Sequence, residues 1–255
     1  MKTPAYTPFI KSVGKTVHHL NTIAVGLAGV ESGDCTKPGK LDVSWNPIDL
    51  RASSRDARSF TLESTIVFVA EELCEYNSKI INSPNVGEVS LKSSERSIKH
   101  EALSKHLSIT PIELSLGPLL LIHWRNRIIH KKSKASLTGT QKKEFTNVSE
   151  TVREGYKNLC INRLLNDFDR KRPTIKDVSS LIAMTINYVK LVEKLIPEPS
   201  SIDDFICWLN QLDLYEQFER AKRVSANKPK PEQAMQNFIL TNCPELLDCY
   251  VRYYE

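Results

Sequence analysis

The sequence has little of what characterises membrane-spanning and exported proteins. Its longest apolar stretch, residues 114–124, is about half the length of a bilayer-crossing helix, and it contains a Gly-Pro pair and a histidine. Residues 1–10 are polar and include two prolines, a composition unlike that of a secretory signal. We therefore expect neither a membrane span nor an export signal.

Cysteine is also scarce, and its spacing fits neither a zinc site nor a redox site. The 6 cysteines stand at positions 35, 74, 160, 207, 243 and 249, so no two form a Cys-x-x-Cys pair. Four of them fall within apolar helical patterns, which indicates free, mostly buried thiols in a reducing compartment. The sequence therefore predicts a cytoplasmic protein that uses no metal and no cofactor.

The chain lacks internal repeats, low-complexity tracts and any convincing alternating strand pattern. Apolar residues instead recur at helical spacing over most of its length, which predicts an all-α fold. A segment at residues 40–45 is the one candidate for a short extended piece. The expected helices cover residues 9–30, 54–81, 94–107, 118–132, 141–169, 175–196 and 202–224, followed by a helical pair interrupted at residues 242–244.

Helix start signals support this division of the chain. Capping-box patterns occur at Thr110–Glu113, Thr174–Asp177 and Ser201–Asp204. The Gly117-Pro118 pair either kinks the helix that begins near Thr110 or restarts it. We expect three parts: an N-terminal helix and loop at residues 1–53, a helical bundle at 54–196, and a C-terminal helical extension at 197–255.

Acidic residues are absent from one window that is rich in positive charge. Residues 114–143 contain seven basic residues, and removing them from the net charge of +5 leaves the rest of the chain at −2. A local basic patch is typical of proteins that contact phosphates, although a solvated loop at a helix end would have the same composition. The seven are Arg125, Arg127, Lys131, Lys132, Lys134, Lys142 and Lys143.

The helix expected at residues 118–132 combines an apolar surface on almost all sides with several polar and ionisable residues. An all-round apolar helix belongs at the centre of a bundle, where ionisable groups are costly unless they are paired or border a cleft. His123, Asn126 and His130 are spaced i, i+3, i+7 on one stripe, and Arg125 lies to one side. The two histidines are roughly 10 Å apart along the axis, too far to chelate one metal unaided.

Arg, Asn and His together suit RNA cleavage by the ribose 2′-hydroxyl. Arginine supplies a permanent charge and a planar fork for phosphate oxygens, asparagine can orient a ligand or a histidine, and histidine exchanges a proton near neutral pH. That reaction requires proton transfer and stabilisation of the charge on the pentacoordinate phosphorus, and it needs no bound nucleophile. We therefore interpret Arg125, Asn126 and His130 as candidate catalytic residues.

Arg125-Asn126-x-x-x-His130 resembles the catalytic motif of the HEPN superfamily, in which arginine, a polar residue and histidine lie on a late helix of an all-α bundle. The resemblance covers roughly residues 54–196, and the flanking segments match no pattern of that family. It implies a metal-independent endoribonuclease of the kind found in bacterial toxins, phage-defence systems and RNA-guided RNases. The catalytic roles that it implies extend only to Arg125, Asn126 and His130.

The same resemblance implies that two copies of the motif form one cleft. No other arginine in the chain is followed five residues later by histidine, so the second copy would come from a homodimer. Trp124 and Ile128, or the apolar residues of the helix at 54–81, would hold the two chains together. An antitoxin or sensor protein is a further partner that such an enzyme would have.

Other interpretations of these residues stay open. Arg127, Lys131 and Lys132 are the expected RNA-binding residues, yet the same basic groups could simply cap a helix end and favour its dipole. A helical module could bind RNA or a nucleotide without cutting, and a helical scaffold could dock another protein through its C-terminal helices. The remaining histidines are expected at the surface and without partners: His18, His19, His100 and His106.

Overall fold

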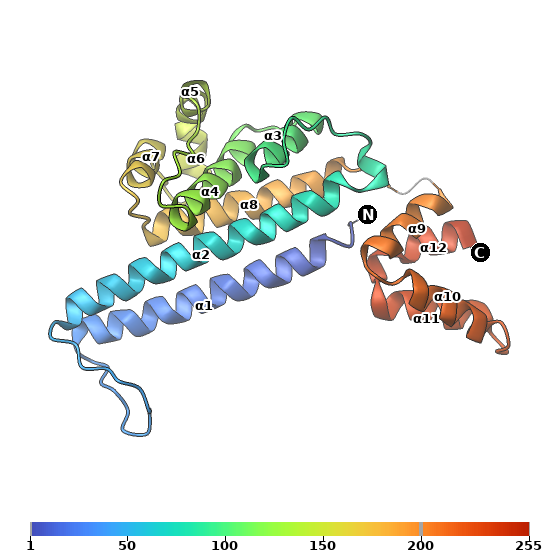
Figure 1. Cartoon of the computed structure of the whole chain (residues 1–255), viewed down its shortest axis with the longest axis horizontal. Coiled ribbons are helices and arrows are strands. Elements are labelled where there is room, and N and C mark those ends of the chain that lie inside the picture. Colours follow the sequence, from blue (N-terminus) through green and yellow to red (C-terminus); the bar gives the residue numbers. More distant parts are fainter. Residues whose placement is uncertain (1, 199–200, 255) are drawn as a thin grey trace. The chain divides into compact units, whose positions relative to one another are not determined.

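The computed structural model describes residues 2–198 and 201–254, and it confirms the all-α prediction. This part of the chain forms twelve α-helices and two short 3₁₀-helices and contains no strand (Figure 1). In chain order they are α1 (Tyr6–Ser32), α2 (Leu50–Ile81), η1 (Pro84–Val86), α3 (Arg96–His106), α4 (Glu113–Ile129), α5 (Gly139–Asn147), α6 (Ser149–Gly155), α7 (Ile161–Asp169), α8 (Ile175–Leu195), α9 (Ile202–Gln211), α10 (Tyr215–Ser225), α11 (Pro231–Asn242), η2 (Pro244–Leu246) and α12 (Leu247–Tyr254).

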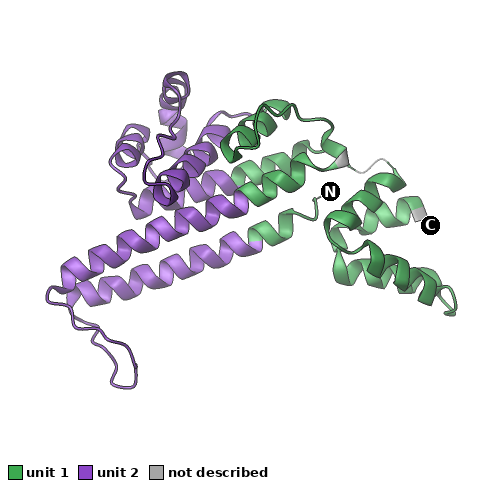
Figure 2. Cartoon of the chain, in the orientation of Figure 1, with its two compact units in different colours: residues 1–10, 74–109, 187–255 green, residues 11–73, 110–186 purple. Residues whose placement is uncertain are grey.

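The chain groups into two compact units, each built from segments that are distant in sequence (Figure 2). Unit 1 comprises residues 1–10, 74–109 and 187–255, and unit 2 comprises residues 11–73 and 110–186. This division differs from the three consecutive segments expected from the sequence, because α1, α2 and α8 each supply residues to both units. No described helix combines the length and the apolar character that crossing a membrane requires.

Helix α4 lies at the centre of unit 2, as its all-round apolar sequence predicts. Residues 119–122 are completely buried, and the Trp124 ring meets Phe168 of α7 edge-on with centroids 5.4 Å apart. Gly117 lets α4 approach α8 closely, because a Cβ at this position would lie 2.5 Å from the Met184 sulfur. The helix continues through Gly117-Pro118 without a restart, so Pro118 lies inside it.

Unit 1 contains a buried polar cluster on the C-terminal part of α2, α3 and α8. The Glu193 carboxylate accepts hydrogen bonds from the Thr3 hydroxyl at 2.6 Å and the Tyr76 hydroxyl at 2.7 Å. Burial raises the pKa of Glu193, while these hydrogen bonds act in the opposite direction. The donors compensate for the loss of water around a group that is 6% exposed.

The second half of this cluster is centred on a fully buried histidine. His100 Nδ1 lies 3.2 Å from the Asn77 side-chain amide, and its ring lies 4.8 Å from that of Tyr188. The Tyr188 hydroxyl donates to Asn77 Oδ1 at 3.3 Å. Asn77 therefore joins α2 to both α3 and α8 within unit 1.

Two of the long helices expected from the sequence are divided in the structure. The segment at 141–169 forms α5, α6 and α7. The first break lies at residue 148, and Lys157 and Asn158, with left-handed φ of 50° and 61°, separate α6 from α7. The segment at 202–224 forms α9 and α10, with Asp213 at φ 55° between them. The apolar spacing continues across these breaks, and asparagine and aspartate tolerate the left-handed region, so periodicity alone did not locate them.

Two of the three expected capping boxes are present. Thr174–Asp177 and Ser201–Asp204 each show the reciprocal side-chain and backbone hydrogen bonds at the start of α8 and α9. The box expected at Thr110–Glu113 does not form, because α4 begins at Glu113 with Ile112 as an N-cap that lacks a side-chain hydrogen bond. Residues 40–45 form irregular chain without a strand.

Candidate functional site

The candidate motif lies at the C-terminal end of α4, which ends three residues earlier than expected. The last helical residue is Ile129, and His130 follows it with ψ of 92°, which turns the chain away from the helix axis. The backbone N–H of His130 still donates to the Asn126 carbonyl at 3.0 Å. His130 is therefore held one turn beyond Asn126, while its side chain is exposed.

Arg125 is held by an ion pair that links α4 to α2 inside unit 2. Its Nε and Nη2 atoms lie 2.6 Å and 2.5 Å from Oε1 of Glu71. Its Nη1 atom donates to Oδ1 of Asn126 at 3.0 Å. The guanidinium group is thus fixed on two sides, and the neighbouring motif residue takes part in fixing it.

The Arg125–Glu71 pair lies at the boundary between the core of unit 2 and solvent. The Arg125 side chain is 13% exposed and that of Glu71 is 39% exposed, so the pair borders solvent rather than lying in the core. Three of the five guanidinium N–H groups face the two partners, which leaves N–H groups for an anion. Glu71 also offsets part of the positive charge, and this attraction would compete with a bound phosphate.

Glu71 did not emerge from the sequence as a site residue. It lies 54 positions before Arg125 and is followed by a second glutamate, Glu72, so no local pattern distinguishes it. Only the packing of α2 beside α4 selects it. This acidic residue is the main addition that the structure makes to the candidate site.

Arg127 has a different environment from Arg125, although the two residues are close together in the motif. Its Nε donates to the Ala135 carbonyl at 2.7 Å, and its Nη1 donates to the Phe168 carbonyl at 3.3 Å. The guanidinium carbon also lies 3.9 Å from the centre of the Phe168 ring. We expected Arg127 to bind RNA, but these contacts use its side chain to close the loop after α4 and to cap the end of α7.

The predicted stripe of His123, Asn126 and His130 brings together residues in unlike environments. Burial, together with the nearby charge of Arg127, lowers the pKa of His123 to about 4. His123 is therefore neutral at pH 7, and its buried Nδ1 has no hydrogen-bond partner among the described residues. The exposed His130 side chain makes no hydrogen bond or ion pair within residues 2–198 and 201–254.

Arg125 and His130 are not in contact within one chain, as far as the described residues show. Positions five apart on an α-helix point about 140° away from each other. Arg125 faces α2, whereas His130 lies beyond the helix end and faces solvent. One chain therefore presents a fixed arginine and an accessible histidine as two separated parts of a site.

The structure extends the basic window with residues that are distant in sequence. Because Arg127 contacts Phe168 and lies 3.5 Å from Asp169, the exposed run that follows α7 lies close to the end of α4. Asp169 also lies 3.6 Å from the Lys142 ammonium, so it offsets part of this charge. We call the following exposed or half-buried set the basic surface: Lys131, Lys132, Lys134, Lys142, Lys143, Arg170, Lys171 and Arg172.

Cysteine and histidine elsewhere show no arrangement for metal binding. In the described part of the chain, no three His, Cys, Asp or Glu side chains gather closely enough to hold a metal ion. The cysteines are free; Cys74, Cys243 and Cys249 are buried, and Cys35 and Cys160 are exposed. Burial raises the pKa of the Cys243 thiol to about 11, so this group stays protonated at neutral pH.

The expectation for the remaining histidines is half right. His18 and His19 are exposed on α1, as predicted. For His100 the prediction is wrong, because it is fully buried beside Asn77. His106 is exposed, as predicted, but it has a partner: its Nε2 lies 2.6 Å from the Val86 carbonyl. Both fall on α3, whose short amphipathic pattern did not reveal that His100 lies on the face that packs inward.

Comparison with known proteins provides no relative for this chain: no protein-family model, no curated protein and no solved structure matches it.

Proposed function

We propose that this protein is a metal-independent RNA endonuclease that cleaves through attack by the ribose 2′-hydroxyl. The observation that carries the proposal is the end of α4, where an arginine fixed by Glu71 and Asn126 is followed by an exposed histidine without partners among the described residues. The basic surface around this point supports an RNA substrate. The resemblance to the HEPN motif favours a cytoplasmic toxin or phage-defence effector, restrained by an antitoxin or sensor partner.

In the proposed reaction, the 2′-oxygen forms a bond to the adjacent phosphorus while the bond from phosphorus to the 5′-oxygen breaks. His130 exchanges the proton, either taking it from the 2′-hydroxyl or giving it to the departing 5′-oxygen. Arg125 stabilises the negative charge on the phosphoryl oxygens, and Asn126 keeps its guanidinium oriented. The products carry a 2′,3′-cyclic phosphate and a 5′-hydroxyl.

A homodimer would supply the two proton-transfer groups that this reaction uses. Since one chain presents a single exposed His130, facing copies would place two histidines and two arginines around one phosphate. Trp124 is 1% exposed and therefore does not fit the interface role that we gave it. The long helix suits that role better, because Phe60 and Phe68 on α2 are 72% and 46% exposed.

The test incubates the purified chain with end-labelled RNA in the presence of EDTA and analyses the ends of the products. We expect cleavage that survives the chelator, a 2′,3′-cyclic phosphate and a 5′-hydroxyl. Loss of activity in EDTA, or products with a 5′-phosphate, would contradict the mechanism. A preparation of His130→Ala made in parallel controls for contaminating nucleases.

The shared cleft is tested separately from the chemistry. Light scattering should show a dimer, and mixing Arg125→Ala with His130→Ala subunits after reversible dissociation should restore part of the activity, because mixed dimers regain one intact set of groups. A fully active monomer would refute the shared cleft while leaving the cleavage mechanism in place.

A second candidate function is RNA binding without cleavage, which the basic surface favours on its own. In that case filter binding would show a steep dependence of affinity on salt, because contacts to phosphates release counterions. The cleavage assay decides between the two, since a pure binding protein leaves the RNA intact at every protein concentration.

A further inference from the structure

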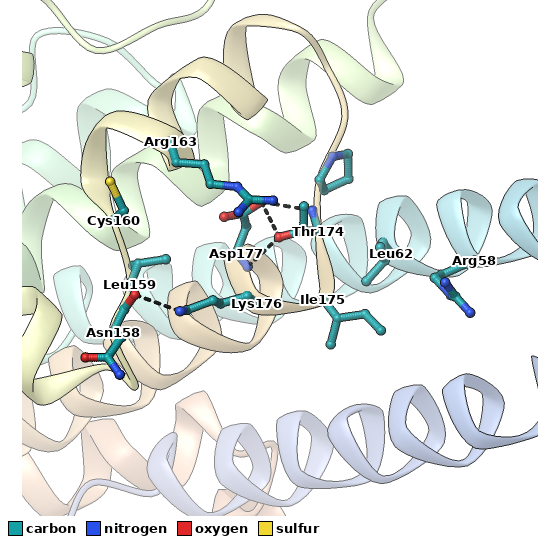
Figure 3. A pocket seen from close by; sticks show the side chains of 11 residues that line it. Arg58, Leu62, Asn158, Leu159, Cys160, Arg163, Thr174, Ile175, Lys176 and Asp177 are labelled. Atoms are coloured by element: carbon teal, nitrogen blue, oxygen red, sulfur yellow. Dashed lines mark hydrogen bonds between the residues drawn. The ribbon is translucent and has the colours of Figure 1, made fainter. Parts of the chain in front are cut away.

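A cavity of about 480 Å³ opens in unit 2 (Figure 3). Its walls come from α2, the segment between α6 and α7, the first turn of α7, the end of the segment between α7 and α8, and the start of α8. The volume falls in the range of roughly 300–1,000 Å³ that is usual for small-molecule sites. Neither the sequence motif nor the proposed cleavage reaction uses this cavity.

Three cationic side chains line the cavity, each from a different element (Figure 3). Arg58 of α2 pairs with Glu31 at 2.8 Å through Nη2, while its buried Nε has no hydrogen-bond partner among the described residues. Lys176 of α8 donates to the Asn158 carbonyl at 2.7 Å, which leaves two of its N–H groups available.

The third cation, Arg163 of α7, is held only loosely. Its Nε lies 3.6 Å from Oδ2 of Asp167, and its side chain is 73% exposed. An ion pair of this length at an exposed site contributes little, so the guanidinium can reorient toward a ligand at small cost. Figure 3 shows this side chain beside Thr174 and Asp177, at the start of α8.

Asp177 is the one carboxylate among the eleven lining residues, and it is already engaged. Its Oδ2 accepts from the Thr174 backbone N–H at 2.9 Å and from the Thr174 hydroxyl at 2.6 Å. Its own backbone N–H donates back to the Thr174 hydroxyl at 3.2 Å. The capping box thus satisfies this acid, and the lining keeps an excess of positive charge.

Of the other lining residues, four are apolar and three are Asn158, Cys160 and Thr174. Leu62, Leu159, Pro173 and Ile175 give the cavity an apolar wall, and Ile175 remains 40% exposed there. Leu62 and Ile175 lie between Arg163 and Arg58 (Figure 3), so apolar and cationic groups are neighbours in the lining. Such a lining suits a ligand that carries an anion at one end and an apolar group at the other. An inorganic anion alone would leave the apolar wall in contact with water.

We propose that this cavity binds a small phosphate monoester whose organic part is apolar, with Arg163 and Lys176 holding the phosphate and Leu62 and Ile175 contacting the organic part. Phosphate fits this donor set because guanidinium and ammonium groups are its usual protein partners. The site is separate from the end of α4: Arg58 precedes Glu71 by 13 positions on α2, which is about 20 Å of helix. The proposal therefore does not depend on RNA cleavage.

The test is isothermal titration calorimetry of the full chain with phenyl phosphate, and with inorganic phosphate and phenol as the two component probes. We expect one molecule of phenyl phosphate to bind per chain, more tightly than either component. Adenosine 5′-monophosphate is a further arm: tighter binding than phenyl phosphate would identify a nucleotide as the source of the phosphate, and weaker binding a smaller organic phosphate. Absence of binding by both esters at millimolar concentration would overturn the proposal.

Variants decide whether the binding occurs in this cavity. Arg163→Ala and Lys176→Ala should each weaken phenyl phosphate binding about tenfold, the effect of removing one charged hydrogen bond. Arg55→Ala is the matched control, because this exposed residue lies one turn before Arg58 on α2 and does not line the cavity. Circular dichroism checks that each variant is folded, and Arg163→Lys should retain part of the affinity if its charge is what matters.

Two outcomes would contradict the assignment. If Arg55→Ala weakens binding as much as Arg163→Ala does, the ester binds through general surface charge rather than in the cavity. If neither ester binds but Arg163→Ala weakens the binding of single-stranded RNA, the cavity is part of an RNA path, and the small-molecule site is wrong.

Discussion

Two polar regions of this protein share the same residue types and have opposite surroundings. In the buried cluster of unit 1, His100 is completely buried, contacts Asn77, and lies beside the ring of Tyr188. At the end of α4 in unit 2, Asn126 orients an arginine, and the neighbouring His130 is exposed and has no partner among the described residues. Both regions combine a histidine with an asparagine.

Comparing the two regions distinguishes polar residues that stabilise the fold from polar residues that are available to react with a ligand. Burying a polar group is costly unless a hydrogen bond replaces water, so the cluster around His100 has the features of a structural element. A histidine that is accessible and unpaired contributes nothing to that framework, and it can exchange a proton with a ligand. Arg125 lies between these cases, because Glu71 fixes it while its edge still borders solvent.

The largest expected effect concerns the exposed region. His130→Ala and Arg125→Ala should each lower the rate of RNA cleavage by about 10²–10⁴-fold, because each removes either proton transfer or charge stabilisation. Asn126→Ala should cost less, since it removes only one hydrogen bond that orients the guanidinium. Single-turnover cleavage of labelled RNA measures these rates.

His18→Ala is the matched control for this prediction, because His18 is an exposed histidine on another helix of unit 2. Its rate should equal that of the unaltered protein. If His130→Ala retains that rate as well, the site is not at the end of α4.

The next effect concerns the buried region. It should change the free energy of unfolding without changing the cleavage rate. His100→Ala should lower the free energy of unfolding by about 2–4 kcal/mol, because it leaves a cavity and an unpaired Asn77 amide. Tyr76→Phe should cost only about 1 kcal/mol, the usual value of one hydrogen bond, since the Thr3 hydroxyl still donates to Glu193. Urea denaturation measures both values.

Cleavage by folded His100→Ala should proceed at the unaltered rate, which distinguishes it from the variants at the end of α4. If its cleavage rate falls as far as that of His130→Ala, the buried cluster also takes part in the chemistry, and the contrast between the two regions does not hold.

The half-buried His123 provides a test that lies between the two regions. Its pKa is lowered to about 4 in the folded chain, below the ordinary value of about 6.5. The unfolded chain therefore binds the proton more readily, so this residue destabilises the fold as pH falls from 6.5 toward 4. At pH 4.5 the loss of stability relative to pH 7 should be on the order of 2–3 kcal/mol.

His123→Leu should remove this part of the pH dependence, because leucine does not titrate. The measurement is the difference between the two proteins in urea denaturation at pH 7 and at pH 4.5, which cancels the titration of other groups. Equal pH dependence in both proteins would mean that His123 is hydrated in the folded chain.

The smallest expected effect concerns the basic surface. Lys131→Ala combined with Lys132→Ala should reduce the slope of log affinity for single-stranded RNA against log salt by roughly 1.4, about 0.7 for each phosphate that a lysine no longer neutralises. Lys228→Ala combined with Lys230→Ala is the control, because both lysines are exposed in a segment outside unit 2. An unchanged slope in the first pair would remove Lys131 and Lys132 from the RNA-binding surface.

The fold class and the position of the central helix could be predicted from the sequence, because both depend on the spacing of apolar residues along the chain. The all-round apolar residues at 119–122 correctly indicated a buried helix, although it ends at Ile129, three residues before the expected end. The breaks at Asn158 and Asp213 could not be predicted, because they interrupt the backbone without interrupting that spacing.

Sequence alone therefore determined which residues of α4 carry chemical groups, while the tertiary structure decided what each group is able to do. Arg125 and Arg127 are equivalent by composition, yet Glu71 orients the first at the edge of the helix and Phe168 engages the second in packing. The reason is that a side chain's environment comes from residues that folding brings close from distant positions. The spacing of residues along the chain does not indicate which distant residues become those neighbours.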